Sequence, residues 1–206
     1  MKARAWLEKF LENPLVYRWH ARMVDRAKEK AILNIRSDYR GLRVLDIGCG
    51  PGNNARLFSG ADYTGMDINP RYVARAAAAY PQARFLAGDA TKTRLGGPFD
   101  VILMNSFLHH LDDREVKEVM GTVVGNLVPA GLAIVQEPLI PGPRQYYHRI
   151  LMRLDRGNHF RTLTEWESLA RQGGLAVVGR SFYSLRVFGL RGYNMLSLAL
   201  APSPSS

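Results

Sequence analysis

Three glycines at alternate positions, Gly48, Gly50 and Gly52, follow the apolar run at 44–47 and are the clearest sign of chemistry in the chain. Glycine has no Cβ, so its backbone adopts positive φ readily and a ligand can approach it closely. Asp67 ends a second apolar segment about twenty residues after the first turn, where a nucleotide ribose is held through its hydroxyls. The strand, the glycine turn and the distal acid together predict a site for an adenosine-containing ligand.

The charges around the glycines distinguish two classes of adenosine ligand. A dinucleotide site favours G-x-G-x-x-G, so that helix N–H groups can hold an anionic pyrophosphate. This chain instead has GCGPG, and Asp46 precedes it, where a carboxylate would repel a pyrophosphate and attract a cation. S-adenosyl-L-methionine carries a sulfonium and an ammonium but no phosphate, so the electrostatics favour it as the cofactor.

Four sequence motifs occur in the order and spacing of one protein family. They are VLDIGCGPG at 44–52, GMDINP at 65–70, GDAT at 88–91 and FDVILMNSFLHHL at 99–111. By these motifs, residues 44–137 resemble class I S-adenosylmethionine-dependent methyltransferases of the small-molecule type, whereas the flanks resemble them much less. The resemblance implies a Rossmann-like α/β fold with a seven-stranded, mostly parallel sheet, helices on both faces and the last strand antiparallel.

The resemblance also implies which residues bind the cofactor. Asp46 and the glycine turn should lie near its methionyl end, and Asp67 should bind the ribose hydroxyls. Asp89 should accept a hydrogen bond from the adenine amino group, and Asn105 should close the pocket after the fourth strand. The full set expected to bind S-adenosyl-L-methionine, or its product S-adenosyl-L-homocysteine, is Asp46, Gly48, Cys49, Gly50, Asp67, Ile68, Asp89, Ala90, Asn105 and Ser106.

Two adjacent histidines, His109 and His110, are the candidate catalytic residues. Methyl transfer from a sulfonium is an in-line displacement, so the protein must align the acceptor and, for a weakly acidic acceptor, remove a proton. An imidazole with an unperturbed pKa of about 6.5 suits that role. Either histidine could instead pack or cap the next helix, Glu137 is a further candidate, and an amine or thiol acceptor would need no base. Adjacent histidines point in different directions, and the chemistry requires no metal, so we predict no metal site.

The acceptor is expected to bind at the insertion that follows the fifth strand. A helix at 144–154 would carry basic residues on one face and apolar residues on another. The candidate substrate contacts in the insertion are Tyr146, Arg149, Arg153 and His159.

The other elements are expected to position these residues within a single domain spanning 1–206. Alternating strands and helices predict parallel βαβ units. The domain should comprise an N-terminal helical cap at 1–40, a cofactor-binding core at 41–137, a substrate-side insertion at 138–174 and a C-terminal strand pair at 175–201. Within the core, strands are expected at 43–47, 62–66, 83–87, 99–104 and 132–137, with helices from residue 53, at 70–79 and at 112–127.

Two helix boundaries carry local signals. Asn13-Pro14 should precede a helix at 15–34, because proline disfavours helix at the residue before it. Thr164, with Glu167 three residues later, should cap a helix at 165–172.

Composition limits the class of protein. A chain of 206 residues with 47% hydrophobic residues suits one globular domain. Its apolar runs are shorter than the ~18 residues that a membrane span needs. Charges interrupt the apolar residues of the N-terminus, so we expect no signal peptide and a cytoplasmic location. The single cysteine, Cys49, cannot form an internal disulfide.

The net charge of +10 lies mainly in the two flanks and suits an anionic acceptor, an anionic membrane surface or nucleic acid. Our main interpretation is methyl transfer to O, N or C of a small-molecule or lipid-like acceptor, with peripheral membrane contact left open. The second is an RNA or other nucleic-acid methyltransferase, although the segment at 105–108 lacks the Asn/Asp-Pro-Pro-aromatic signature of base amino methylation. The third is a non-catalytic partner subunit with a methyltransferase fold, which the intact glycine turn and Asp67 disfavour.

Overall fold

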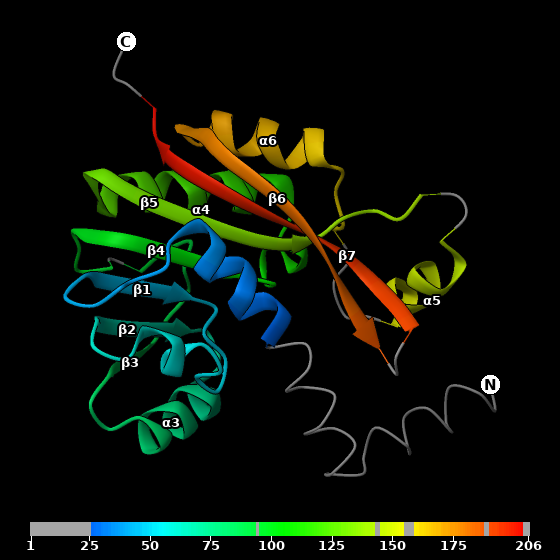
Figure 1. Cartoon of the computed structure of the whole chain (residues 1–206). Helices are drawn as coiled ribbons and strands as arrows, with labels where there is room; N and C mark the ends of the chain where they lie inside the picture. The colour runs from blue at the N-terminus through cyan, green and yellow to red at the C-terminus, as the bar shows by residue number, and fades with distance from the viewer. Residues whose placement is uncertain (1–25, 94, 143–144, 155–158, 188–189, 204–206) are drawn as a thin grey trace.

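The computed structural model describes residues 26–93, 95–142, 145–154, 159–187 and 190–203 (Figure 1). Seven strands form one sheet in the order β3-β2-β1-β4-β5-β7-β6. The strands are β1 (Arg43–Ile47), β2 (Asp62–Asp67), β3 (Arg84–Ala87), β4 (Phe99–Asn105), β5 (Leu127–Pro138), β6 (Leu175–Val187) and β7 (Leu190–Pro202). The helices are α3 (Pro70–Ala79), α4 (Asp113–Asn126), α5 (Tyr146–Leu154), α6 (Leu163–Gln172), the 3₁₀ helices η1 (Ala55–Phe58) and η2 (Leu108–His110), and an unlabelled helix at 26–35.

The strand directions confirm the predicted fold class. Strand β1 pairs in parallel with β2 and β4, and the parallel pairing extends outward to β3 and β5. Strand β7 runs antiparallel to both β5 and β6. Because the first five strands are parallel, their carboxyl ends meet at one edge of the sheet, where ligands of open α/β sheets bind.

Apolar residues cover both faces of the sheet, as expected for parallel strands that are buried on both sides. Along β1, Leu45 and Ile47 pack into a core with α4 and α6, whereas Val44 packs into a second core with Ile32 of helix 26–35. In Figure 1 helix 26–35 crosses the front of the sheet, and α4 lies behind it. Helices therefore lie on both faces, as predicted.

Helix α4 begins with a reciprocal capping box. The Asp112 carboxylate accepts the Glu115 N–H at 2.9 Å, and the Glu115 carboxylate accepts the Asp112 N–H at 2.9 Å. Two N–H groups of the first turn are thus satisfied, which stabilises the start of the helix. Its position agrees with the helix predicted at 112–127.

The helix predicted from residue 53 is wrong. The glycine turn continues through Gly52, which has a φ of 86°, and the only helical turn that follows is the four-residue η1. Gly60, with a φ of 89°, then reverses the chain into β2. These two turns leave seven residues between them, which form only one 3₁₀ turn, and periodicity alone could not show where both turns fall.

The predicted N-cap at Thr164 is also wrong. Thr162 is the N-cap of α6, and its partner in a capping box is Glu165, whose carboxylate accepts the Thr162 N–H at 2.7 Å. Both pairs have the same spacing, so sequence could not choose between them. Glu167 instead forms an ion pair with Arg180 of β6 at 3.1 Å.

The N-terminal helix predicted at 15–34 coincides with the observed helix at 26–35 over the residues that the structure describes. The rest of that prediction lies outside the described residues. No helix among the described residues is long and apolar enough to cross a membrane.

Candidate active site

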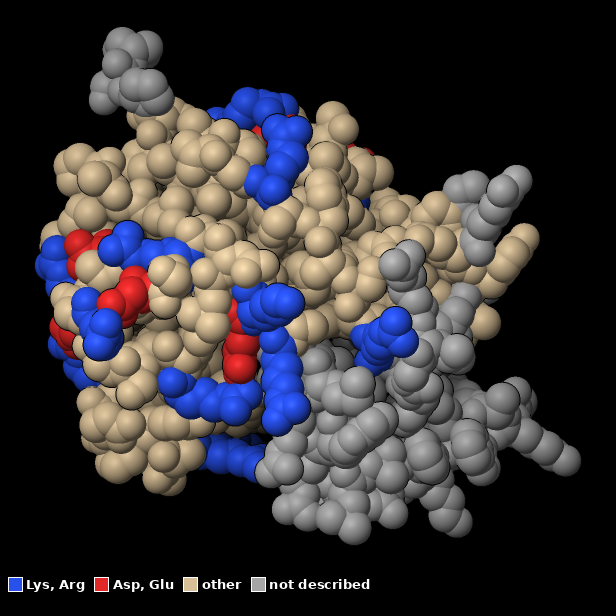
Figure 2. Space-filling view, in the orientation of Figure 1, with Lys and Arg blue, Asp and Glu red and all other residues tan. Residues whose placement is uncertain are grey.

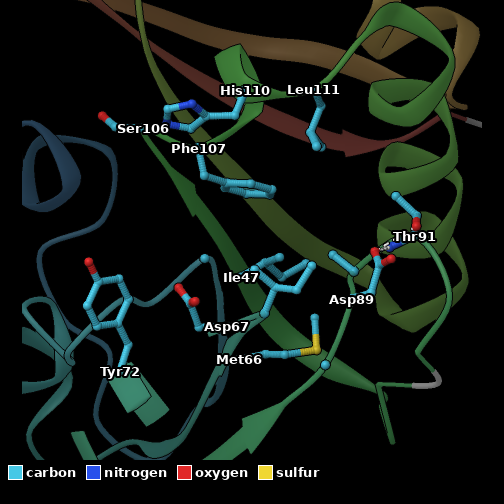
Figure 3. Close-up of a pocket in the computed structure, with 14 residues that line it drawn as sticks. Ile47, Met66, Asp67, Tyr72, Asp89, Thr91, Ser106, Phe107, His110 and Leu111 are labelled. Carbon is cyan, nitrogen blue, oxygen red and sulfur yellow. Dashed lines mark hydrogen bonds between the residues drawn. The ribbon is translucent and has the colours of Figure 1, made fainter. Parts of the chain in front are cut away.

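A pocket of about 430 Å³ opens at the carboxyl ends of β1 to β4 (Figure 3). Residues that follow β3 form one side of it, which we call the β3 side, and residues that follow β4 form the β4 side. The lining residues are Ile47, Gly48, Met66, Asp67, Ile68, Tyr72, Gly88, Asp89, Ala90, Thr91, Ser106, Phe107, His110 and Leu111. Six of the ten predicted cofactor residues are among them.

Asp67 fastens the glycine turn to the end of β2. Its carboxylate accepts the Gly50 N–H at 2.8 Å through one oxygen and the Asn69 N–H at 2.8 Å through the other. Gly48 and Gly50 have φ values of 74° and 55°, which side-chain-bearing residues rarely adopt. Each carboxylate oxygen can accept a further hydrogen bond, so Asp67 can position the turn and also bind hydroxyls of a ligand.

Asp89 organises the turn on the β3 side. Its carboxylate accepts hydrogen bonds from the Thr91 N–H at 2.9 Å and the Thr91 hydroxyl at 2.7 Å, and Lys92 Nζ lies 3.1 Å away. The hydrogen bonds from Thr91, with a smaller contribution from Lys92, lower the pKa of Asp89 to about 2. Asp89 is therefore ionised at neutral pH. Ile68, which is exposed, lines the same pocket.

Four predicted cofactor residues are not among the residues that line the pocket. Asp46 is 0% exposed and accepts hydrogen bonds from Tyr63 Oη at 2.7 Å and Asn54 Nδ2 at 3.0 Å. Burial raises its pKa to about 6, and its Oδ1 has no hydrogen-bond partner. Cys49 is buried, and burial raises the pKa of its thiol well above the usual range, which disfavours any role as a nucleophile. Gly50 and Asn105 complete the four.

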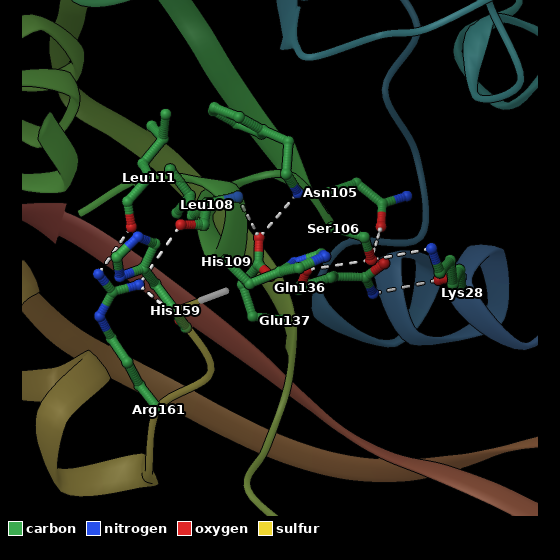
Figure 4. Close-up of polar contacts among 11 residues, drawn as sticks. Lys28, Asn105, Ser106, Leu108, His109, Leu111, Gln136, Glu137, His159 and Arg161 are labelled. Atoms are coloured by element: carbon green, nitrogen blue, oxygen red, sulfur yellow. Dashed lines mark hydrogen bonds and ion pairs between the residues drawn. The ribbon is translucent and has the colours of Figure 1, made fainter. Parts of the chain in front are cut away.

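The rings of the two adjacent histidines lie 4.3 Å apart but have different surroundings, and Figure 4 shows those of His109. His110 lines the pocket, whereas His109 is 4% exposed and its Nδ1 lies 2.6 Å from Glu137 Oε2. The other oxygen of Glu137 accepts the N–H groups of Phe107 and Leu108 at 3.0 and 2.8 Å. Glu137 thus fixes the segment that carries His110, and of the two histidines only His110 is among the residues that line the pocket.

Arg161 holds the same segment from the opposite side. It is 4% exposed, donates to the carbonyl oxygens of Leu108 at 3.4 Å and Leu111 at 2.8 Å, and pairs with Asp113 at 2.7 Å. Leu139 at the start of the insertion forms an isolated bridge with Arg161. The insertion therefore leaves and returns at one place beside the pocket.

A chain of hydrogen bonds crosses the carboxyl edge of the sheet. Lys28 Nζ donates to Ser106 Oγ at 2.8 Å, and Ser106 Oγ donates to Asn105 Oδ1 at 3.2 Å. Asn105 Nδ2 donates to Asn54 Oδ1 at 3.2 Å, and Asn54 donates to Asp46. Among the described residues, Ser106 is the one non-glycine residue with a positive φ, at 58°. Such backbone strain is concentrated at functional sites.

A family sequence model described as "Methyltransferase domain" matches residues 9–179. The chain belongs to this family. The resemblance to class I S-adenosylmethionine-dependent methyltransferases is thereby confirmed, and S-adenosyl-L-methionine is the cofactor that the family implies.

The relatives of this methyltransferase-family chain include enzymes named for a small acid. It is 38% identical over 99 residues to trans-aconitate 2-methyltransferase of Klebsiella pneumoniae, covering 46% of this chain and 38% of that protein. It is 28% identical over 155 residues to an uncharacterized methyltransferase of Synechocystis, covering 70% of this chain and 71% of that protein. The chain spans 38% to 50% of the length of the trans-aconitate 2-methyltransferases that it matches.

Solved structures share the methyltransferase fold. Mitomycin 7-O-methyltransferase MmcR aligns with a TM-score of 0.67 and 20% identity over 86% of this chain and 54% of that chain. A methyltransferase from Methanosarcina mazei aligns with a TM-score of 0.68 and 20% identity over 84% of this chain and 97% of that chain.

The pocket residues fit the cofactor of the family. The carboxylates of Asp67 and Asp89 face the pocket, and the buried carboxylate of Asp46, with its unpartnered oxygen, lies behind the glycine turn. This negative charge suits a ligand that carries a sulfonium and an ammonium, and would oppose a pyrophosphate. Among the residues that the structure describes, no three His, Cys, Asp or Glu side chains cluster where they could hold a metal ion.

The predicted acceptor contacts lie outside the pocket lining. Tyr146 is 72% exposed on α5, and Arg149 is also exposed there. Arg153 belongs to the same helix, but its side chain is not among those described. The His159 N–H donates to the carbonyl oxygen of His109 at 3.0 Å, which brings His159 next to η2. A role for these four residues in acceptor binding stays a prediction.

Sequence reasoning missed several residues of the site. Tyr72 of α3 and Thr91 line the pocket, and no motif singled them out as ligand contacts. Arg161 and Lys28 belong to the two basic flanks, and no local pattern distinguishes them from the other basic residues there. Only the fold buries Arg161 against η2 and brings Lys28 to Ser106.

Gly48→Ala is expected to weaken binding of S-adenosyl-L-homocysteine by about tenfold or more, because strain at positive φ adds to a steric clash. A Cβ at Gly48 would lie 2.8 Å from the Phe107 ring. Gly50→Ala is the matched control, since Gly50 also has a positive φ but a Cβ there meets nothing within 4 Å. Calorimetric titration of both variants measures the effect, and equal affinities would contradict the role given to Phe107.

Proposed function

We propose that this chain transfers a methyl group from S-adenosyl-L-methionine to a small anionic acceptor, with a carboxylic acid as the favoured class. The observation that carries the proposal is the distribution of charge over the two sides of the pocket. Its β3 side and the glycine turn present Asp67 and Asp89, whereas its β4 side presents Ser106 and His110, with Lys28 bonded to Ser106. Acidic groups thus gather where a cationic cofactor would bind, and a cation adjoins the opposite side.

S-adenosyl-L-methionine supplies an activated methyl group on a sulfonium. In this proposal Asp67 binds the ribose hydroxyls, and Asp89 and Ala90 bind the adenine. The backbone at Gly48 lets the ligand approach the turn closely. His110 accepts a proton from an acceptor hydroxyl when there is one to remove, and a carboxylate acceptor needs no such step.

Two observations support an anionic acceptor. The relatives named trans-aconitate 2-methyltransferase act, by their name, on a small carboxylic acid. The chain carries a net charge of +10, and Lys and Arg side chains gather over helix 26–35 on the face shown in Figure 2. A positive surface beside a pocket raises the local concentration of anions.

Calorimetric titration of the purified chain with S-adenosyl-L-methionine, S-adenosyl-L-homocysteine and NAD tests the cofactor. We expect the first two to bind and NAD not to bind. Release of S-adenosyl-L-homocysteine is then measured with trans-aconitate, with other small di- and tricarboxylates, with their amides and with RNA. Turnover of the acids alone supports the proposal. Turnover of RNA would favour a nucleic-acid methyltransferase, and failure to bind any cofactor would favour a non-catalytic subunit.

His110→Ala is expected to lower kcat by roughly 10²-fold if the acceptor must lose a proton, since this is the usual contribution of a general base. Affinity for S-adenosyl-L-homocysteine should change little, and the thermal midpoint should be retained. His109→Ala should instead lower the thermal midpoint and change kcat less, because His109 is buried against Glu137 and does not line the pocket. Unchanged turnover of His110→Ala with a hydroxyl acceptor would remove His110 from the mechanism.

A further inference from the structure

The insertion returns to the sheet along η2, through residues 159–161, which we call the return segment. The His159 N–H donates to the carbonyl oxygen of His109 at 3.0 Å. The Phe160 ring stacks on the His109 ring, with 5.3 Å between the ring centroids and 17° between the planes. Arg161 donates to one backbone carbonyl oxygen at each end of η2. Each residue of the return segment therefore contacts the short helix that ends at His110.

Arg161 fixes the return segment in place. Arginine has five N–H donors, and this buried guanidinium donates to three backbone carbonyl oxygens and, from two of its nitrogens, to the carboxylate of Asp113. Its carbon also lies over the Trp166 ring, 4.7 Å from the centroid. Figure 4 shows Arg161 beside η2. Phe160 adjoins this anchor in the chain, so its ring is held against η2.

The ring of His109 connects Phe160 to the pocket. It is buried, and its Nδ1 lies 2.6 Å from Oε2 of the buried Glu137. The His109 ring cannot turn without losing both this contact and the stacking with Phe160, and each of these contributes to its stability. The centroid of the fixed ring is 4.3 Å from that of His110, and the two planes are inclined by 38°.

His110 is the member of this aromatic series that lines the pocket, and its side chain is exposed. An exposed side chain ordinarily samples several staggered rotamers. Contact with the fixed ring of His109 favours the one rotamer found here. A group that removes a proton must lie within hydrogen-bond reach of it, so the orientation of the His110 ring matters for the reaction as well as for the fold.

We propose that Phe160 is a positioning residue for methyl transfer, which keeps the His110 ring directed into the pocket by holding the ring of His109. This inference rests on the proposed function, in which His110 accepts a proton from the methyl acceptor. It gives the insertion a part in the catalytic geometry, in addition to the acceptor contacts predicted for it.

The test is the NMR signal of the His110 ring in the full chain, produced with isotope-labelled histidine and assigned by its loss in His110→Ala. Addition of S-adenosyl-L-homocysteine should shift this signal, because His110 lines the pocket. In Phe160→Leu the shift should fall to about half or less, since a ring that samples about three rotamers faces the pocket only part of the time. Calorimetry on the same samples establishes that each chain is saturated with the ligand.

Three further variants separate positioning from packing. Phe160→Met keeps an apolar side chain without a ring and should behave as Phe160→Leu does, whereas Phe160→Tyr keeps the ring and should retain the full shift. Phe182→Leu is the matched control, because Phe182 is 57% exposed on β6 and the same substitution there should leave the His110 signal unchanged. A lower thermal midpoint with an unaltered His110 shift in the Leu and Met variants of Phe160 would mean that Phe160 only packs, and would overturn the inference.

The inference would also be overturned if Phe160→Tyr or Phe182→Leu lost as much of the shift as Phe160→Leu, or if the ligand bound to the unsubstituted chain without shifting the His110 signal. These results would leave the proposed methyl transfer intact. Failure of the unsubstituted chain to bind S-adenosyl-L-homocysteine would instead overturn the proposed function, and this inference with it.

Discussion

Glu137→Ala is expected to lower the free energy of unfolding by roughly 3–5 kcal/mol, since several buried groups lose their partner at about 1–3 kcal/mol each. The carboxylate is fully buried, accepts the Phe107 and Leu108 N–H groups through one oxygen, and has its other oxygen 2.6 Å from His109 Nδ1. An alanine leaves those donors without water or protein to replace it. Because Phe107 and His110 line the pocket, affinity for S-adenosyl-L-homocysteine should fall as well.

Glu137→Gln separates the two functions of this carboxylate. Its amide oxygen can still accept the Phe107 and Leu108 N–H groups, but its NH₂ group would face His109 Nδ1. A glutamine side chain cannot offer an oxygen both to these N–H groups and to Nδ1, so His109 loses its present arrangement with residue 137. We expect a smaller loss, about 1–2 kcal/mol. Urea unfolding measures both variants, and a loss below about 1 kcal/mol for Glu137→Ala would refute the role assigned to Glu137.

Asp67→Ala is expected to weaken cofactor binding by roughly 1–3 kcal/mol through the loss of charge-assisted hydrogen bonds. Part of the loss concerns the proposed ribose contacts. The rest follows from the structure, because the Gly50 N–H loses the acceptor that fastens the glycine turn to β2. The turn should therefore become more mobile, and hydrogen exchange at Gly50 should increase.

Asp62→Ala is the control for Asp67→Ala. Asp62 begins the strand that Asp67 ends, and it forms an exposed ion pair with Arg84 at 3.0 Å. Exposed pairs contribute about 0–1 kcal/mol to stability, so this variant should bind the cofactor normally. Calorimetry with S-adenosyl-L-homocysteine measures both variants. If Asp67→Ala bound S-adenosyl-L-homocysteine with unchanged affinity, the assignment of Asp67 to the ribose site would be refuted.

The sheet was predictable because its signals are local. Apolar runs mark β1, β2 and β4, glycines mark the turn after β1, and the alternation of strands and helices predicts the parallel direction of the first five strands. Where two candidate N-caps had the same local pattern, the sequence could not distinguish between them. Thr162 with Glu165 and Thr164 with Glu167 have identical spacing, and the packing of α6 selects the first.

The site was predictable only where a motif carries it. Gly48, Asp67 and Asp89 lie within motifs and do line the pocket. The contact that buries His109 against Glu137 spans 28 residues of the chain, and the contact of Lys28 with Ser106 spans 78 residues. Such pairs of residues come together only through tertiary packing, so no local sequence pattern predicts them.

The bridge between Leu139 and Arg161 limits what a change in the length of segment 140–160 costs. The Ile140 N–H donates to the carbonyl oxygen of Arg161 at 3.2 Å, so the two ends of segment 140–160 are held together. Closing a longer loop across fixed ends costs only about 0.6 kcal/mol for each doubling of its length. A change in the length of the segment should therefore cost little stability, provided that two contacts within it are kept: buried His148 accepts the Asn194 N–H of β7 at 3.4 Å, and the His159 N–H donates to the carbonyl oxygen of His109 at 3.0 Å.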